Sequence, residues 1–346
     1  MTARRKVTVS SSIHFSQRSR TLANETISLW NGTTIPRLGM GCWAIGGPYH
    51  SGNTALSWGT VNDQESRKAI ERALDLGIRF FDTASSYGAG HSEEILGTAL
   101  KNRSDVVIAT KFGNMFDPST KQALGSSATP AFIRDSTEQS LRRLQRDSID
   151  LLQFHINGHP IDEAIAVFDT LDELRHGGKI AAYGWSTDDP TRAEAFADRP
   201  GFVTVQHNLN VLDPAPDMIA VVERFNLVSI NRGPLAMGLL SGKFDHVKLP
   251  EDDVRSSNAA WLRYFKDGAV QPEFRRKLDS VRELLRSDGR TLVQGALGWI
   301  WATSPRTLPI PGFRNVTQVE ENVGALEKGA LSPATMTEIK TLIGSS

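Results

Sequence analysis

Short apolar runs alternate with longer stretches of helical periodicity from residue 27 onward. Eight of these runs are nearly continuous in apolar residues, which is typical of parallel strands covered by helices. The predicted strands span residues 37–43, 79–84, 106–111, 149–155, 180–186, 202–210, 227–232 and 307–312. The predicted helices between and after them span residues 63–76, 131–145, 161–175, 190–197, 214–225, 291–302 and 316–327.

This alternation predicts a single α/β domain with a closed (β/α)8 barrel, the TIM-barrel architecture. Consecutive parallel strands need helical crossovers, and eight such units are the number that closes a barrel of this kind. A doubly wound open sheet is the alternative. The stretch 233–270 after the seventh strand is too long for a plain connection and is expected to be functional. Residues 271–287 predict an extra amphipathic helix.

Local signals refine the pattern. Asn31-Gly32 within residues 27–35 predicts a hairpin with a type I′ turn, placed to cover the N-terminal end of the barrel. Gly77 is expected to end helix 63–76 as its C′ glycine. Ser92 is expected to cap a further helix, whose first turn carries Glu93 and Glu94.

The charge balance and the cysteine content limit which binding partners and which cellular compartment are expected. The chain has 39 Lys+Arg and 39 Asp+Glu, so nothing favours nucleic acid or an acidic surface as a partner. Cys42 is the only cysteine, which excludes an intrachain disulfide and favours a reducing, cytoplasmic location. No run of 18 apolar residues occurs, so no membrane span is expected.

The first 24 residues differ from the rest in charge. They contain Arg4, Arg5, Lys6, Arg18 and Arg20 and no acidic residue. A transit peptide would have this composition, and so would a solvated, disordered arm, which is the simpler interpretation. The predicted organisation is a basic arm at 1–24 and one barrel domain at 25–346.

Polar side chains lie at or just beyond the ends of three consecutive predicted strands. Asp82 lies near the end of the second strand with Tyr87 in the loop beyond, and Lys111 and His155 end the third and fourth. The carboxyl ends of barrel strands form the active-site face, and neighbouring strands lie ~4.8 Å apart. The four groups are therefore expected to converge.

This set suits hydride addition to a carbonyl, in which negative charge grows on oxygen and a proton must arrive. Tyr87 is the predicted proton donor, and a lysine ammonium ~4 Å away would lower its pKa from ~10 by up to roughly three units. Asp82 would hold Lys111 in place, and His155 would orient the carbonyl oxygen. Singly, each residue has a structural explanation: a solvated lysine, a packed histidine, or a turn capped by Asp82-Thr83. Their convergence favours the catalytic interpretation, which depends on the barrel.

Residues 77–94, GIRFFDTASSYGAGHSEE, resemble the GxxxxDTAxxYGxxxSE signature of the aldo-keto reductases. Further motifs follow in the order of that family and extend the resemblance over about residues 34–328: LGMGCW at 38–43, ATK at 109–111, SLRRL at 140–144, IDLLQFH at 149–155, GPLAMGLLSGK at 233–243 and LPIPGFRNVTQVEEN at 308–322. The resemblance implies the tetrad Asp82, Tyr87, Lys111 and His155. It also implies an oxidoreductase that binds NADP(H) without a Rossmann domain and acts on a small carbonyl or alcohol substrate.

The resemblance also implies positions that contact the cofactor. Ser186 and Gln206 match residues that hold the nicotinamide carboxamide, residues 233–243 match the pyrophosphate loop, and Arg314 matches a contact to the adenosine 2′-phosphate. The absence of acid between Gly312 and Val319 favours NADP(H) over NAD(H). The implied cofactor set is Gly41, Cys42, Asp82, Ser186, Gln206, Arg232, Gly233, Pro234, Leu235, Gly238, Leu240, Gly242, Lys243, Gly312, Phe313, Arg314, Gln318, Glu321 and Asn322.

Two positions depart from the family pattern. Thr187 stands where an asparagine usually follows Ser186, and Arg232 stands where an aromatic ring often stacks on the nicotinamide. A guanidinium plane can also stack, so Arg232 is expected to cover the ring and to disfavour its cationic oxidised form.

The substrate is expected to meet Trp43, Tyr87 and His155. The loop 48–58, with Tyr49, His50 and Trp58, is a candidate for the pocket rim, although packing explains these three residues equally well. Cys42 is expected to fill space near the cofactor and not to act as a nucleophile.

Two other functions were weighed. A metal-dependent hydrolase could use His155, His159 and Asp82, but the spacing does not follow a helix face and Lys111 would oppose a cation. A binding module similar to the β-subunits of potassium channels would hold NADPH with little turnover. Sugars, aldehydes, ketones and the reverse oxidation of alcohols all stay open as substrates, as does the oligomeric state.

Overall fold

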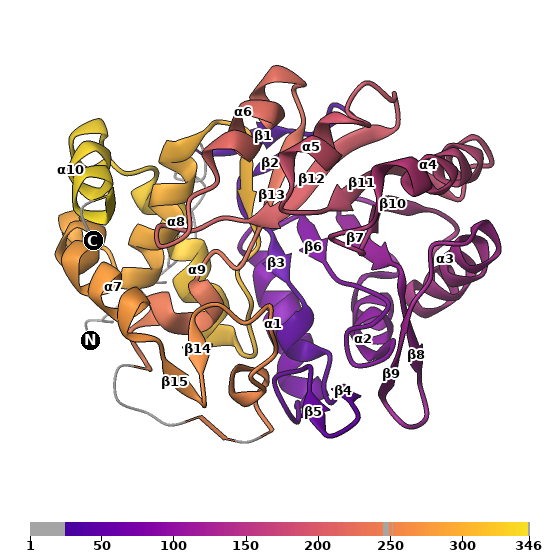
Figure 1. Ribbon diagram of the computed structural model, residues 1–346, viewed down its shortest axis with the longest axis horizontal. Helices are drawn as coiled ribbons and strands as arrows, with labels where there is room; N and C mark the ends of the chain where they lie inside the picture. The colour runs from indigo at the N-terminus through magenta and orange to yellow at the C-terminus, as the bar shows by residue number, and fades with distance from the viewer. Residues whose placement is uncertain (1–24, 245–248, 251, 345–346) are drawn as a thin grey trace, which may run out of the picture.

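The computed structural model describes residues 25–244, 249–250 and 252–344, so the predicted arm at 1–24 lies outside the described residues. Eight parallel strands lie at the centre of the molecule (Figure 1). They are β3 (Met40–Gly41), β6 (Phe80–Asp82), β7 (Val107–Phe112), β10 (Ile149–Phe154), β11 (Ile180–Ser186), β12 (Phe202–Asn208), β13 (Val228–Arg232) and β16 (Thr307–Pro309). They follow the predicted strands one for one, and the first is the most shortened.

The ring of strands is closed between β3 and the segment after β16. Gly41 forms a parallel bridge with Gly312, and the N–H groups of Gly39 and Gly41 donate to the carbonyls of Pro309 and Pro311, both at 3.0 Å. A β-carbon at Gly41 would lie 2.6 Å from the Ile310 carbonyl oxygen, so only glycine allows this approach. The barrel prediction is confirmed, and the open-sheet alternative is wrong.

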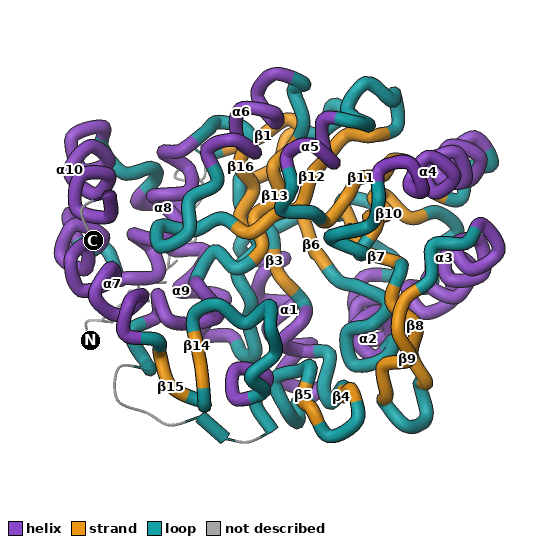
Figure 2. The backbone as a smooth tube through the Cα atoms, in the orientation of Figure 1, coloured by secondary structure: helices purple, strands orange, loops and turns teal. Residues whose placement is uncertain are grey.

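Helices form the outer layer around the strands (Figure 2). They are α1 (Asp63–Asp75), α2 (His91–Leu100), α3 (Pro130–Leu144), α4 (Ile161–His176), α5 (Pro190–Glu194), α6 (Pro216–Arg224), α8 (Leu292–Thr303) and α9 (Val316–Lys328). The predicted extra helix is α7 (Pro272–Leu285), and it packs beside α10 (Pro333–Gly344), which was not predicted. None of the helices in the described ranges is long and apolar enough to cross a bilayer.

Smaller elements lie in the loops. The short strands are β1 (Thr26–Ser28), β2 (Thr34–Pro36), β4 (His50–Ser51), β5 (Thr54–Ala55), β8 (Asn114–Asp117), β9 (Gln122–Ser126), β14 (Phe265–Lys266) and β15 (Ala269–Val270). The 3-10 turns are η1 (Trp43–Ile45), η2 (Ala236–Ser241), η3 (Val254–Ser256) and η4 (Ser287–Gly289). The β8–β9 hairpin was not predicted, because its residues lack the apolar alternation that marks a half-buried strand.

The N-terminal hairpin covers one end of the barrel, as expected. Ile27, Leu29 and Ile35 share one buried cluster with interior barrel residues such as Phe80 and Val107. The predicted type I′ turn is wrong, however. The connection is longer than two residues, and within it only Gly32 has a positive φ, of 79°. A type I′ turn needs two such residues in succession.

The helix that follows Tyr87 also starts differently from the prediction. Helix α2 begins at His91 after the left-handed Gly90, so Ser92 lies inside the helix and is not its cap. The buried Ser92 hydroxyl instead donates to the Cys42 carbonyl at 2.9 Å and accepts from Thr83 at 2.8 Å. Ser92 therefore ties α2 to the ends of β3 and β6. Gly77, with φ 91°, does end α1 as predicted.

The loop that carries Tyr87 is fixed by two glycines in contact. Gly88 has φ 61°, and a β-carbon there would lie 1.7 Å from the Gly46 carbonyl oxygen. We predict that Gly88→Ala lowers the free energy of unfolding by about 3 kcal/mol or more, because backbone strain and a steric clash add together. Urea unfolding measures this change.

Gly52→Ala is the matched control. Gly52 has a similar φ of 56°, but a β-carbon there would meet nothing within 4 Å. Its alanine variant should lose only the roughly 1–2 kcal/mol of left-handed strain. Equal losses at the two positions would show that Gly46 and Gly88 are not closely packed.

Candidate active site

A buried ion pair lies at the carboxyl ends of the second and third barrel strands. Lys111 on β7 donates from Nζ to Asp82 Oδ1 on β6 at 2.5 Å, and both side chains are almost completely buried. The ammonium also donates to the Thr83 carbonyl at 2.8 Å. Burial is the largest single effect and lowers the pKa of Lys111, but Asp82 and Tyr87 together raise it by more. This pKa therefore lies above its ordinary value, and the ammonium stays charged.

The second carboxylate oxygen of Asp82 accepts two further hydrogen bonds. Gln206 of β12 donates to Oδ2 at 2.7 Å, and Gln153 of β10 donates to it at 3.1 Å. The amides of Gln206 and Gln153 also bond to each other at 3.1 Å. A buried charge needs such partners, and here three other strands, β7, β10 and β12, supply them across the barrel mouth.

The Tyr87 hydroxyl lies against the ammonium of this pair, with Lys111 Nζ 3.3 Å from the Tyr87 oxygen. The aromatic ring is held by Trp43, which stacks on it with ring centroids 6.0 Å apart, and by His155, which meets it edge-on at 6.1 Å. Burial raises the pKa of the Tyr87 phenol, and this outweighs the lowering by Lys111. The expected net lowering of that pKa is therefore wrong for the protein alone: the hydroxyl is protonated at neutral pH.

His155 follows β10 and is neutral. Burial, together with repulsion from Lys111 and Arg232, holds its pKa well below the ordinary value. The side-chain amide of Asn114, on the unpredicted β8, lies 3.2 Å from His155 Nδ1. An amide N–H can only donate, so Nδ1 accepts and the imidazole proton lies on Nε2. His155 is thus prepared to donate a hydrogen bond from Nε2.

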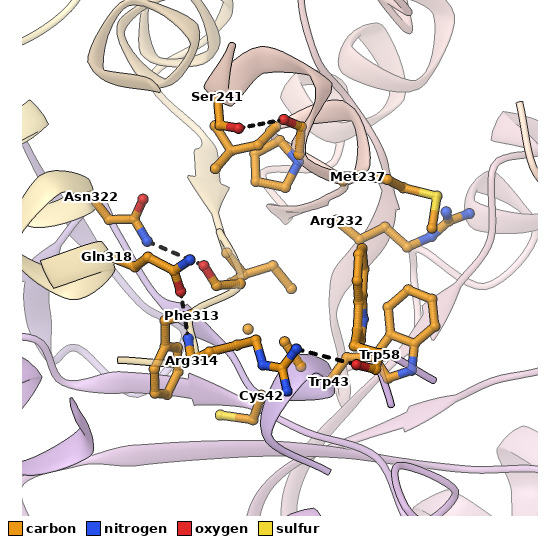
Figure 3. Close-up of a pocket in the computed structure, with 18 of the residues that line it drawn as sticks. Cys42, Trp43, Trp58, Arg232, Met237, Ser241, Phe313, Arg314, Gln318 and Asn322 are labelled. Atoms are coloured by element: carbon orange, nitrogen blue, oxygen red, sulfur yellow. Dashed lines mark hydrogen bonds between the residues drawn. The ribbon is translucent and has the colours of Figure 1, made fainter. Parts of the chain in front are cut away.

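A pocket of about 390 Å³ opens beside these residues (Figure 3). It runs from Asp82 and Tyr87 past the loop after β13 to the start of α9. The residues named from the sequence that line it are Gly41, Cys42, Trp43, Asp82, Tyr87, Gln206, Arg232, Gly233, Pro234, Leu235, Gly238, Lys243, Gly312, Phe313, Arg314, Gln318, Glu321 and Asn322. Five residues of the catalytic and cofactor sets named from the sequence are not among the lining residues: Lys111, His155, Ser186, Leu240 and Gly242. Ser186 nevertheless pairs with Gln206 in the register of β11 and β12.

The far end of the pocket is built by the segment that leads into α9. The backbone N–H of Arg314 donates to Gln318 Oε1 at 2.7 Å, and Asn322 donates to the Gly312 carbonyl at 3.4 Å. The Asn315 side chain caps the helix at the Gln318 N–H. This segment therefore presents a helix N-terminus and a guanidinium at one place, an arrangement suited to an anion.

Comparisons with known proteins identify the family. The family model described as "Aldo/keto reductase family" matches residues 37–343. The chain belongs to the aldo-keto reductase family.

Individual relatives span nearly the whole chain. Aldo-keto reductase YhdN of Bacillus subtilis is 31% identical over 84% of this chain and 84% of its own. A Schizosaccharomyces pombe protein named aldo-keto reductase yakc, with NADP(+) in its name, is 29% identical over 89% of this chain and 88% of its own. The solved structure of the glycerol dehydrogenase AKR11B4 from Gluconobacter oxydans is 29% identical, covers 93% of this chain and 96% of its own, and superposes with a TM-score of 0.77.

This aldo-keto reductase departs from the family pattern around Arg232. The guanidinium of Arg232 lines the pocket and forms an ion pair with Asp188, which comes just after the unusual Thr187. The Thr187 hydroxyl turns away to the Asn157 carbonyl, at 2.9 Å. Asp188 is held by the Asn208 N–H at 2.8 Å and the Asn157 amide at 3.1 Å, so it is a fixed anchor for Arg232.

Several lining residues were missed or named only as rim candidates. Arg255 and Phe244 lie in the stretch 233–270, whose length predicted function but whose individual residues carried no motif. Trp58 was a rim candidate, and it does line the pocket. Tyr49 and His50 do not line it, and the buried Tyr49 ring has a pKa raised by burial to about 12. Cys42 is fully buried, and burial raises its thiol pKa well above the usual value, as expected of a residue that only fills space.

The donors proposed for the metal-hydrolase alternative are engaged elsewhere in the reductase. Both Asp82 oxygens are bonded to Lys111 and the two glutamines. His159 packs edge-on against Phe154, with centroids 5.1 Å apart. In the described ranges, no group of three or more His, Cys, Asp or Glu residues has the geometry of a metal site.

Removing one partner of the buried Lys111–Asp82 pair should change the free energy of unfolding in a predictable way. Lys111→Met should lower the free energy of unfolding by about 3–5 kcal/mol, because it leaves the Asp82 charge buried without its counter-ion. The double variant Asp82→Asn, Lys111→Met should recover most of that loss. Chemical unfolding at pH 7 measures both.

Lys68→Met, which breaks the exposed Lys68–Glu65 pair, is the matched control and should change stability by less than about 1 kcal/mol. A double variant as unstable as Lys111→Met would contradict the assigned ion pair.

Proposed function

We propose that this aldo-keto reductase is an NADP(H)-dependent oxidoreductase that interconverts a carbonyl compound and its alcohol, with Tyr87 as the general acid and base. The observation that carries the proposal is the Tyr87 hydroxyl at 3.3 Å from a charged, completely buried Lys111. When bound, the nicotinamide supplies or accepts the hydride. The chain's own residues supply the proton and fix the oxygen.

Each side chain has a distinct role in this proposal. In the reducing direction Tyr87 gives its proton to the substrate oxygen, and Lys111 stabilises the phenolate that is left. Asp82 keeps the ammonium charged and aimed at Tyr87. His155 donates from Nε2 to the same substrate oxygen, because Asn114 occupies its other nitrogen. In the oxidising direction the phenolate takes the proton back.

The pocket fits a dinucleotide with a 2′-phosphate. Lys243 and Arg314 bring positive charge to the wall, and the glycines 233, 238 and 312 allow close backbone approach. Arg314 lies beside the N-terminus of α9, where anionic groups are favoured. The S. pombe relative carries NADP(+) in its name. These features together support NADP(H) over NAD(H).

The catalytic end of the pocket has an aromatic wall made by Trp43, Trp58 and Tyr87. We assign to this end a small aldehyde, ketone or sugar, with Trp43, Tyr87 and His155 as its nearest contacts. The relative named glycerol dehydrogenase supports oxidation of a CH–OH group as the reverse reaction.

The proposal predicts a separation of binding from turnover at residue 87. Tyr87→Phe should reduce turnover of a reactive aldehyde by about 10² or more, the scale of a lost general acid, and leave NADPH binding nearly unchanged. Loss of NADPH absorbance at 340 nm reports turnover, and fluorescence titration reports binding. A variant with near-parent rates would show that Tyr87 is not the proton donor. A parent protein that binds NADPH and turns over no carbonyl would favour the regulatory binding module instead.

Arg232 is proposed to lie over the nicotinamide and to disfavour its positive oxidised form. We predict that Arg232→Leu shifts the ratio of dissociation constants for NADP+ and NADPH by about threefold to tenfold in favour of NADP+, because a repulsive charge is removed. Titration of both forms measures the ratio. Arg224→Leu, which removes an exposed arginine paired with Glu194 near the end of the outer helix α6, is the charge-matched control. Equal ratios in the parent and Arg232→Leu would refute this role.

A further inference from the structure

One arginine links the far end of the pocket to its catalytic end. The Arg314 guanidinium donates from Nη1 to the Trp58 carbonyl at 3.2 Å and from Nη2 to the Thr60 carbonyl. Figure 3 shows the bond to Trp58 crossing the pocket from Arg314. The residues 58–60, which we call the rim segment, contain no helix or strand, so these side-chain bonds replace the backbone pairing that the segment lacks.

The rim segment carries a tryptophan that reaches the catalytic tyrosine through one intervening ring. Trp58 meets Trp43 edge-on with centroids 5.2 Å apart, and Trp43 stacks on Tyr87 at 6.0 Å. A shift of Trp58 therefore changes the shape of the wall against which a substrate would pack. Edge-to-face and stacked pairs of this kind are sensitive to displacement.

A second arginine holds the other side of the same segment. The Arg255 guanidinium lies 4.8 Å from the Trp58 ring centroid and is itself fixed by Asp253 through bonds of 2.7 and 2.8 Å. The Val254 N–H donates to the Ser57 carbonyl at 2.9 Å. Two arginines therefore hold Trp58. Arg255 of η3 lies against its ring, and Arg314, from the segment that leads into α9, bonds to its carbonyl.

We propose that Arg314 is a positioning residue for the substrate pocket, in addition to its place at the phosphate end: it fixes the rim segment and so sets the position of the Trp58 wall. The part of this inference that concerns substrate rests on the proposed function. The substrate class that the wall selects is a carbonyl compound with a flat, apolar body, because the aromatic side chains of Trp58 and Trp43 both line the pocket.

The two roles of Arg314 are chemically compatible. A guanidinium has five N–H donors in a fixed plane, and two of them serve the Trp58 and Thr60 carbonyls. The others stay available for a phosphate. A lysine keeps the charge but cannot serve two carbonyls with a rigid fork, so Arg314→Lys separates the roles.

The first test is a double-mutant cycle with 4-nitrobenzaldehyde as the probe at saturating NADPH. Arg314→Lys should raise the KM of the aldehyde about fivefold and change kcat by less than about twofold, since Trp58 is displaced and Tyr87 is not. Trp58→Ala should raise the same KM at least as much. Arg314→Lys should add nothing further in the Trp58→Ala background, because the arginine acts through that ring. An effect of Arg314→Lys confined to the KM of NADPH, or one that multiplies with that of Trp58→Ala, would overturn the proposal.

The second test needs neither cofactor nor turnover. Hydrogen exchange of a peptide covering residues 56–62, followed by mass spectrometry, should be faster in cofactor-free Arg314→Lys than in the parent. Lys243→Leu is the control, because it removes a cation from the same pocket but from the loop after β13, and it should leave this exchange unchanged. Unchanged exchange in Arg314→Lys would show that the carbonyl bonds do not hold the rim segment. A parent protein that turns over no carbonyl or alcohol would refute the proposed function, and the exchange result would still decide whether Arg314 holds the rim segment.

Discussion

The constraint on which the site depends is the burial of a full positive charge at the mouth of the barrel. Lys111 is completely inaccessible to solvent, so its ammonium must be matched by Asp82 and by backbone oxygen. Asp82 in turn needs the two glutamine amides supplied by β10 and β12. The network spans β6, β7, β10 and β12, so the closed ring of strands is what makes the charge tolerable. The charge, once fixed, determines the environment of the Tyr87 hydroxyl.

Closure of the ring also decides which distant segments meet. Glycines at 39 and 41 allow β3 to approach the chain after β16 at hydrogen-bond distance. This contact places Trp43, just after β3, near Arg314, just after Gly312. The proposed substrate wall and the proposed phosphate end of the pocket therefore lie at the same place in the barrel, where β3 meets the chain after β16, although some 270 residues separate them in the chain. Arg314 connects this part of the barrel to the rim segment through its bonds to the Trp58 and Thr60 carbonyls.

Much of this was predictable from the sequence, because it depends on local pattern. Continuous apolar runs indicate buried parallel strands, and strand ends then identify Asp82, Lys111 and His155 without further information. Tyr87 is identified in the same way, in the loop just beyond the second strand, and the family resemblance adds the cofactor positions. The failures have a common physical origin in tertiary contacts. Ser92 resembles a helix cap locally, yet it bonds to Cys42 and Thr83. Asn31-Gly32 resembles a tight turn, yet the hairpin connection is longer.

Side chains in the connections between the barrel strands were the least predictable part of the site. Asn114, Arg255 and Trp58 carry no periodic signal, and their positions depend on how loops from different strands pack together. The pKa of Tyr87 is raised and not lowered as expected, for a related reason. The distance to Lys111 was foreseeable, but the extent of burial, which outweighs the ammonium in raising that pKa, was not.

The pH dependence of hydride transfer in a single turnover, measured with the enzyme preloaded with NADPH and mixed with an aldehyde, tests the central claim most directly. The Tyr87 phenol, whose pKa lies above its usual 10, must be protonated to act as the acid. The account predicts a rate constant that is constant between about pH 6 and 9 and falls only as the pH rises beyond about 10. A rate constant that falls between about pH 6 and 8 would instead identify a histidine-like acid, and would contradict the assignment of Tyr87 beside Lys111 as the proton donor.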